Sequence, residues 1–355
     1  MSTDERGRLG ADQRGAIVVI GLFASVFIVG GLYYLLGFGA SLRHGERMQD
    51  AADATTFSSA VMHARGMNLV ALMNMVKLAV TVVMAGLLAI MAAAASTIAW
   101  ITGGGPHRFH RYAWTIPLLA LIIAEAKSLH DTAEPPAQEI LAAADRIQVT
   151  LRDQLPAIAA EKARQAVLPR YAPVAIDLRP WPDARPLPIE EGTAMDLCRR
   201  ANPYGTGMGK RAFLEVPSGK IAGIALGYHV GEFPALCVAQ NVRPMQVSDA
   251  RLGGEAYQIR LLIAGQPLAT LGEEGVKVAT FRADEDPGHI GALRDDLSRV
   301  SFAQAEYYFE GPQSEAEMLW HMQWRARLRR FRFPGGALPP ELGLLGPGGD
   351  EWVVH

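Results

Sequence analysis

The sequence predicts an α+β protein: an N-terminal transmembrane helix that continues into an α-helical region, followed by a small β-rich C-terminal domain. Three observations lead to this class. Residues 16–38 form an apolar run without a charged side chain. Apolar residues then recur at helical spacing as far as about residue 168. From about residue 221 they alternate with polar residues, which is typical of strands.

Composition sets the limits on size and on partners. The chain has 355 residues, of which 50% are hydrophobic and 20% are charged, so most of it is expected to fold. The formal net charge is −2. A nucleic-acid-binding surface needs clustered Lys and Arg to neutralise phosphates, and this balance does not indicate one. We therefore expect no nucleic-acid partner.

The run from Ala16 to Phe38 is long enough to cross a bilayer. A hydrocarbon layer of roughly 30 Å needs about 20 helical residues at about 1.5 Å each. The alternative is a cleaved secretory signal, but its apolar core is only roughly 7–15 residues long. Length favours a retained membrane anchor. Residues 1–15 carry Arg6, Arg8 and Arg14, which favours a cytoplasmic leader.

Residues 39–77 are predicted to be a juxtamembrane helix. Phe57, Val61 and Ala64 are spaced at steps of three and four. Many small side chains, such as Ala51 and Ala52, would let a second helix approach closely.

Residues 78–125 form a hydrophobic helical region. Leu78 to Thr102 has no charge and is either a second membrane span or a buried, alanine-rich helix. Three glycines and a proline in Gly103 to Arg111 must break this helix, and the segment resembles a basic membrane-flanking loop. Trp114 to Ala124 is too short to cross and fits a re-entrant or interfacial segment. If only the second run crosses, the C-terminal domain is cytoplasmic; if both later runs or neither cross, it lies outside.

Prolines mark the expected boundaries in the remaining chain. Pro135 and Pro136 are expected to end the hydrophobic zone, and residues 126–168 contain amphipathic helices with a kink or break at Pro156. Residues 169–200 are predicted to be a proline-rich linker, an α+β domain spans residues 201–333, and residues 334–355 form a flexible tail.

Alternation predicts several strands in the C-terminal domain. They cover Ile224 to Val230, Tyr257 to Ile263, a strand beginning at Val276, and Phe302 to Phe309. Glu315 to Phe331 fits either a helical face or an edge strand.

Motifs for catalysis are not evident. GTGMGKR at Gly205 to Arg211 lacks the spacing and the Ser or Thr of a phosphate-binding loop, so we expect a plain glycine loop. His107 and His110 sit among arginines and are better explained by the basic loop than by a metal. We expect no enzymatic activity, no cofactor, no metal and no small-molecule substrate. Cys198 and Cys237 could form a disulfide outside the cytoplasm, but two buried thiols are at least as compatible with their spacing.

The N-terminal third resembles the TadE/TadG-like family of Flp (tight-adherence) pilus-assembly proteins of bacteria. The similarity begins with Arg14 to Ala16 and continues in RMQDAADATTFSSAVMHARGMN, Arg47 to Asn68. Asn74 stands where relatives often carry another Asn. AQAEYYF (Ala303 to Phe309) and WRARL (Trp324 to Leu328) resemble elements of larger members. The motif residues on which an interaction role is expected are Gln49, Ala51, Ala52, Asp53, Ala54, Arg65 and Asn68.

The resemblance implies a non-enzymatic component of the bacterial inner membrane, with most of its chain outside the cytoplasm. The expected partners are the lipid bilayer and other membrane proteins of pilus assembly or secretion. The chain departs from prepilins, which carry a Glu five residues into the mature helix, because Ile20 stands there. A DxSxS metal-adhesion motif is not matched by Asp296, Ser298 and Ser301 either. The alternative is a polytopic membrane sensor or transport accessory protein.

Overall fold

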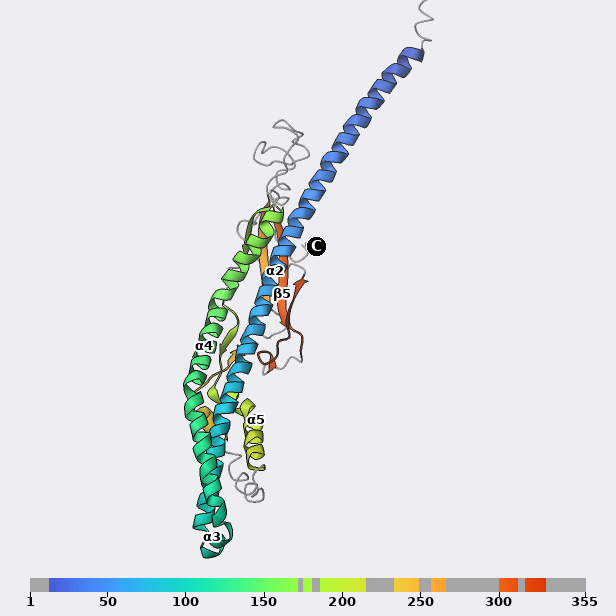
Figure 1. Ribbon diagram of the computed structural model, residues 1–355. Coiled ribbons are helices and arrows are strands. Elements are labelled where there is room, and N and C mark those ends of the chain that lie inside the picture. The colour runs from blue at the N-terminus through green and yellow to red at the C-terminus, as the bar shows by residue number, and fades with distance from the viewer. Residues whose placement is uncertain are drawn as a thin grey trace, which may run out of the picture.

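The computed structural model describes residues 13–171, 175–180, 186–214, 233–248, 257–265, 300–311 and 317–329. It is mostly helical, with an apolar helix at the N-terminus and small antiparallel sheets in the C-terminal region (Figure 1). The predicted α+β class is confirmed at this level. Residues 1–12 of the expected leader, the tail, and the strands at Ile224 to Val230 and from Val276 lie outside the described residues, whereas residues 13–15 of the leader belong to the first helix.

One helix, α2, runs without interruption from Gln13 to Gly103. The sequence has no proline between Gln13 and Gly105, so no residue in this stretch removes a helical N–H donor. The predicted anchor, the juxtamembrane helix and the apolar run after it are therefore turns of a single rod. At about 1.5 Å per residue the rod is about 135 Å long.

The chain reverses direction at the end of α2. Gly105 adopts a positive φ of 79°, a conformation that suits glycine, and Pro106 opens the short helix α3 (Pro106–Tyr112). A 3₁₀ turn, η1 (Ala113–Thr115), leads into α4 (Ile116–Tyr171). Helix α4 packs back along α2, so the two form a long antiparallel hairpin (Figure 1).

Prolines do not end α4, which corrects the expectation for Pro135 and Pro136. The helix continues through both residues and through Pro156. An interior proline usually costs about 3 kcal/mol because it removes a hydrogen bond and crowds the preceding turn. Pro135 and Pro136 are exposed, so water can reach the carbonyl groups that they leave unpaired. On either side, Ala126 and Ala137 are buried, which keeps the helix in place.

Two antiparallel sheets follow the hairpin. The larger has the strand order β1–β4–β5–β6, and the smaller pairs β2 with β3. The bounds of the strands are β1 Ala175–Pro180, β2 Ile189–Glu191, β3 Met245–Val247, β4 Tyr257–Gly265, β5 Val300–Phe309 and β6 Trp324–Arg329. The predictions for Tyr257 to Ile263 and for Phe302 to Phe309 are confirmed. The ambiguous C-terminal segment contributes the edge strand β6.

Two helices accompany the sheets: α5 (Ala194–Leu214) and α7 (Phe233–Val238). Helix α5 begins within the residues predicted to form a linker and includes GTGMGKR, so the expected glycine loop is wrong. Gly205 explains this outcome, because a Cβ atom there would meet the Phe233 ring at 1.8 Å. Glycine is required here for close helix packing.

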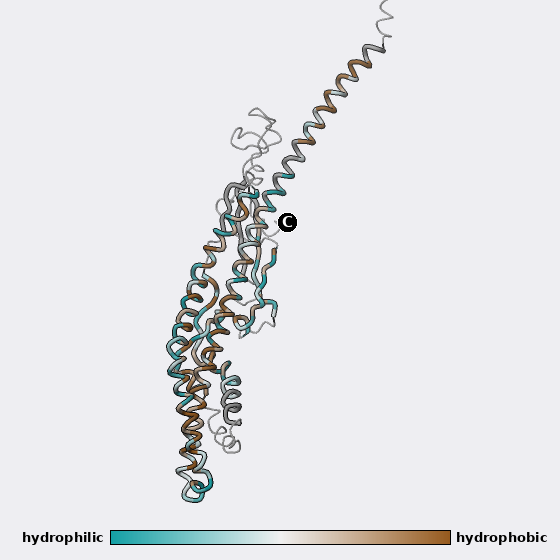
Figure 2. Tube along the Cα trace, in the orientation of Figure 1, coloured by the Kyte–Doolittle hydropathy of each residue, from teal (hydrophilic) through white to brown (hydrophobic). Residues whose placement is uncertain are grey.

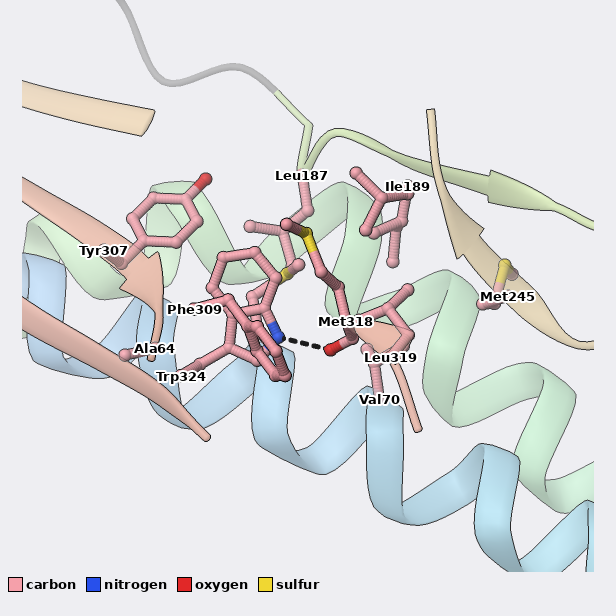
Figure 3. Close-up of a cluster of buried hydrophobic side chains, with 12 residues drawn as sticks. Ala64, Val70, Leu187, Ile189, Met245, Tyr307, Phe309, Met318, Leu319 and Trp324 are labelled. Carbon is pink, nitrogen blue, oxygen red and sulfur yellow. Dashed lines mark hydrogen bonds between the residues drawn. The ribbon is translucent and has the colours of Figure 1, made fainter. Parts of the chain in front are cut away.

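The main core lies between α2, α4 and the sheets (Figure 3). Helix α2 contributes Ala64, Met67 and Val70, which pack under strand residues such as Tyr307 and Trp324. The Trp324 indole N–H donates a hydrogen bond to the Met318 carbonyl at 2.8 Å (Figure 3). The middle of the rod thus carries the sheet domain, and its first turns extend away from it.

Candidate interaction site along the long helix

The first turns of α2 are apolar and are not buried against any other element that the structure describes. Ile17–Leu36 is long and apolar enough to cross a membrane, and none of it is buried. Phe27, for example, is 84% exposed. The brown segment at the N-terminal end of the tube in Figure 2 is this stretch. Such a large exposed apolar surface needs a non-aqueous environment.

Two further stretches in the described part of the chain also satisfy the criteria of length and composition for a membrane span. They are Gln49–Gly103 and Pro106–Tyr171. Both differ from the first stretch because parts of them are buried against other elements. The motif residues lie at the start of the second stretch.

The QDAADA block begins the buried part of α2. Ala51 and Ala52 are fully buried and form a cluster with Val167 of α4 and Ala303 of β5. Ala54 packs at the edge of this cluster. These small side chains let three elements meet at one point, as the sequence predicted for a second helix.

Gln49 and Asp53 flank the alanines one helical turn apart. The Gln49 amide donates to the Asp53 carboxylate at 3.0 Å. Desolvation raises the pKa of Asp53, and the hydrogen bond from Gln49 opposes this shift. Arg65, the remaining charged motif residue, is exposed.

Asn68 binds the backbone of a strand that lies far away in the sequence. Its amide group donates to the Trp324 carbonyl at 3.1 Å, and its carbonyl oxygen accepts from the Trp324 N–H at 3.0 Å. The side chain therefore satisfies both backbone groups of the first residue of β6. Six residues later, Asn74 repeats the arrangement with the smaller sheet.

Asn74 is fully buried and makes more hydrogen bonds than Asn68. It donates to the carbonyls of Met245, at 2.7 Å, and of Leu319, at 3.0 Å, and it accepts from the Met245 N–H at 3.0 Å. Gln148 of α4 donates to the same Asn74 oxygen at 2.9 Å. One asparagine thus joins both hairpin helices to β3 and to the turn before β6.

Lys77 and His63 complete the polar face of α2. The Lys77 side chain is 1% exposed, pairs with Asp145 of α4, and donates to the Arg243 carbonyl at 3.0 Å. His63 stacks on Tyr307 with the ring centroids 5.1 Å apart, and its Nδ1 lies 2.8 Å from the Ser59 carbonyl. Burial lowers the pKa of His63, which favours the neutral ring.

The two C-terminal segments singled out in the sequence are neighbouring strands. Glu306 of AQAEYYF has a fully buried side chain that pairs with Arg327 and, at 2.8 Å, with Arg329. Arg327 also lies over the Tyr308 ring, 4.4 Å from its centroid. Both strands face the motif helix, through Ala303 and Tyr307 of β5 and Trp324 of β6.

The disulfide lies farther along α2, beyond the sheet domain. Cys198 of α5 and Cys237 of α7 are bonded, with their Cα atoms 5.5 Å apart. They pack with Val82 and Ala85 of α2 and with Phe233. The structure therefore pairs the two cysteines and does not leave them as two buried thiols.

Sequence reasoning missed Lys77, Gln148, His63 and Glu306 as structural residues. Lys77 had a signal: it is the only Lys, Arg, Asp or Glu between Arg65 and Arg108. A single charge in a long apolar stretch indicates a specific partner. In the described residues, no group of three or more His, Cys, Asp or Glu is placed to hold a metal ion.

Comparison with known proteins gives no match. No protein-family model, curated protein or solved structure is significantly similar to this chain.

Proposed function

We propose that this chain is a non-enzymatic, membrane-anchored, TadE/TadG-like component of Flp-type pilus assembly or of the bacterial cell envelope. It acts through helix packing and an extracytoplasmic interaction domain. The observation that carries this proposal is the convergence of the three resembling segments. The motif helix contacts AQAEYYF through Ala51 and Ala52, and contacts WRARL through Asn68.

The anchor in this proposal is Ile17–Leu36 alone. Irregular backbone and sheet edges are not tolerated in lipid, because their polar groups would lose hydrogen bonds. Asn68 and Asn74 hold strand backbone directly against α2, and Lys77 ion-pairs beside them. These contacts favour water around the middle of the rod, and so favour a single-pass protein over the polytopic alternative.

The disulfide supports an extracytoplasmic C-terminal region. Disulfides persist in oxidising compartments and are rare in the cytosol. The basic leader favours a cytoplasmic N-terminus, and a single span then places the rest of the chain on the opposite side. Both arguments give the same orientation in the inner membrane.

The anchor can be tested with charges placed at its centre. Phe27→Lys together with Ile28→Lys adds two charges, each costing about 2.5–3.5 kcal/mol at the middle of a span. We expect the double variant to move from the membrane pellet to the soluble fraction after ultracentrifugation. Leu69→Lys and Leu72→Lys, at two exposed positions of the rod, form the matched control and should stay in the pellet. Wild-type protein in the soluble fraction without detergent would contradict the anchor.

The assignment to pilus assembly needs a cellular experiment. Deleting the gene should remove surface pili seen by electron microscopy, and the wild-type gene should restore them. In cells with a permeabilised outer membrane, an impermeant thiol reagent should label Cys198 and Cys237 only after reduction. Unchanged pili would count against the role in assembly, and labelling only after lysis would place the domain in the cytoplasm.

A further inference from the structure

The hairpin tip is the part of the molecule farthest from the anchor. We use this name for residues 103–114, which lie at the opposite end of the rod from Ile17–Leu36 (Figure 1). The tip has four exposed basic or titratable side chains in two pairs: His107, Arg108, His110 and Arg111. Phe109 and Trp114 beside them are 45% and 62% exposed.

The positive charge of the tip is not balanced by its own hairpin. The sequence has no Asp or Glu from Ala54 to Ala124. In the part of the chain that the structure describes, Arg108 and Arg111 lie over aromatic rings instead of carboxylates. The Arg108 guanidinium carbon is 4.8 Å from the Trp100 ring centroid, and that of Arg111 is 5.5 Å from the Tyr112 centroid. The tip is therefore a cationic surface held in place by aromatic side chains.

An apolar face continues from the tip into α4. Trp114, Pro117 and Leu121 are three and four residues apart and all exposed, Leu121 by 63%. Leu118, Ile122 and Ile123 are their neighbours on α4 and are partly buried, so this end of the hairpin is apolar on several sides. In Figure 2 the turn at the lower end of the tube is pale and teal, and the brown turns of the hairpin lie just above it.

We propose that the hairpin tip binds an anionic phospholipid surface, separate from the bilayer that holds the anchor. Amphipathic aromatic rings and basic side chains are the residues that settle at the level of lipid headgroups. Arg and Lys beside an anionic leaflet are attracted to it without needing a shaped pocket. The charge and the lack of carboxylates favour an anionic partner, and the exposed aromatic and apolar side chains favour lipid over an acidic protein.

The contact is interfacial and does not span the bilayer. Arginines are expensive at the centre of a bilayer, and the tip would carry two of them inward first. On the α4 side, exposed Glu125 and Lys127 end the apolar stretch after Ala124, which leaves too few residues to cross. Phe109 and Trp114 instead reach the boundary between headgroups and acyl chains.

The length of α2 sets the distance between the anchor and the tip. The α2 helix is continuous between Leu36 and Gly103, a length of about 100 Å. An anchor in one bilayer and a tip on a second would hold the two surfaces about that far apart. This bridging rests on the proposed anchor, whereas the affinity of the tip for lipid does not.

The test uses the full chain, inserted through its anchor into nanodiscs of phosphatidylcholine. Vesicles of phosphatidylcholine and phosphatidylglycerol are added, and nanodiscs that float with them are quantified. We expect capture by the anionic vesicles, weakened at high salt, and little capture by pure phosphatidylcholine vesicles. Arg108→Gln with Arg111→Gln should weaken capture roughly 25-fold, and Trp114→Ser should weaken it further.

A charge-matched control carries Arg146→Gln with Arg170→Gln, which removes two exposed arginines of α4 away from the tip. This variant should be captured like the wild type, and all variants should melt at the same temperature. Equal capture by neutral and anionic vesicles, no capture at low salt, or equal loss in both double variants would each overturn the proposal. Insertion into nanodiscs reports the anchor and flotation reports the tip, so the two failures are distinguishable.

Discussion

At the residue scale, two asparagines connect the helical and sheet parts of the protein. A helix normally has no free backbone groups to offer a strand, so contacts between them depend on side chains. Asn68 and Asn74 each present one donor and one acceptor, as another strand would. Polar groups buried this way fix which strand residue lies opposite each helical turn, because any slip leaves them unsatisfied.

Truncating these asparagines tests that role. Asn68→Ala removes two hydrogen bonds at a partly buried site, and we expect the free energy of unfolding to fall by about 2 kcal/mol. Asn74→Ala leaves backbone groups of Met245 and Leu319 and the Gln148 amide with one partner fewer in a dry core, so a loss on the order of 4 kcal/mol is expected. Urea unfolding in detergent measures both. Arg65→Ala on the same helix should change stability by less than about 0.5 kcal/mol, and a reversed order of the two asparagines would contradict the argument.

His63 should make the contact between helix and sheet sensitive to pH. Its pKa in the folded protein lies below the ordinary value of 6.5, because burial disfavours the charged ring. As the pH is lowered, His63 therefore takes up a proton in the unfolded chain before it does so in the folded protein. The part of the free energy of unfolding that is present above pH 6.5 is lost as the pH falls below 6.5. We expect His63→Gln to flatten this loss between pH 7.5 and 5.5. Leu69→Gln, at an exposed position on the same helix without a titratable group, should leave the pH dependence as in the wild type; if His63→Gln did the same, another group would be responsible.

At the element scale, small residues set the distance between the hairpin helices. Buried alanines recur along both partners, among them Ala60 and Ala64 of α2 and Ala144, Ala159 and Ala163 of α4. Small side chains bring helix backbones close together, and the contact area then accumulates over many turns. Gly66 is a point of close approach, since a Cβ atom there would meet Leu155 at 1.9 Å.

Gly66→Ala should therefore destabilise the hairpin, although alanine is the better helix former. We expect a loss of about 1–3 kcal/mol, because the Leu155 side chain must leave its position. Gly39→Ala, at a position with nothing within 4 Å, should instead stabilise by about 0.5–1 kcal/mol. Thermal unfolding followed by circular dichroism measures both signs. If the clash is the cause, Leu155→Ala should cost less free energy of unfolding in the Gly66→Ala background than in the wild type. Additive effects of the two substitutions would rule out the clash.

The disulfide joins two helices, α5 and α7, that both pack against α2. It closes a loop between residues 39 apart in the sequence, and the loop-entropy estimate for that length is about 4 kcal/mol. We expect reduction to release α5 and α7 from α2 while the hairpin stays folded. Hydrogen exchange with and without reductant measures this: protection should fall in residues 194–207 and 233–238 and stay unchanged around Asn74. Uniform loss of protection would show instead that the disulfide stabilises the whole fold.

At the scale of the whole molecule, local patterns were predictable and long-range contacts were not. The anchor's apolar length and the alternation of Tyr257 to Ile263 are visible in neighbouring residues. Asn68 pairs with a residue 256 positions away, and periodicity carries no information on such a partner. The predictions for Pro135 and GTGMGKR were wrong because tertiary packing overrode local propensity. The continuity of α2 was not predicted. Its changes in amino-acid composition look like boundaries between separate helices, but they mark changes in what surrounds a single helix.

That continuity makes a mechanical prediction. If Gln13–Gly103 is one stiff rod, the hairpin and its sheets should stand away from the membrane at a narrow range of angles. Gly45→Pro lies between the anchor and the first buried motif residues, and an interior proline kinks or breaks a helix at about 3 kcal/mol. We expect images of single nanodiscs to show rods at one preferred angle for the wild type and a broad spread for Gly45→Pro. Gly45→Ala is the matched control and should keep the narrow distribution.

Flotation with anionic vesicles should persist in the proline variant, because the tip itself is unchanged, while the spacing between the two lipid surfaces loses its definition. A broad distribution already in the wild type would show that the composition change near Gly45 is a hinge, and the rod would then be two independent helices.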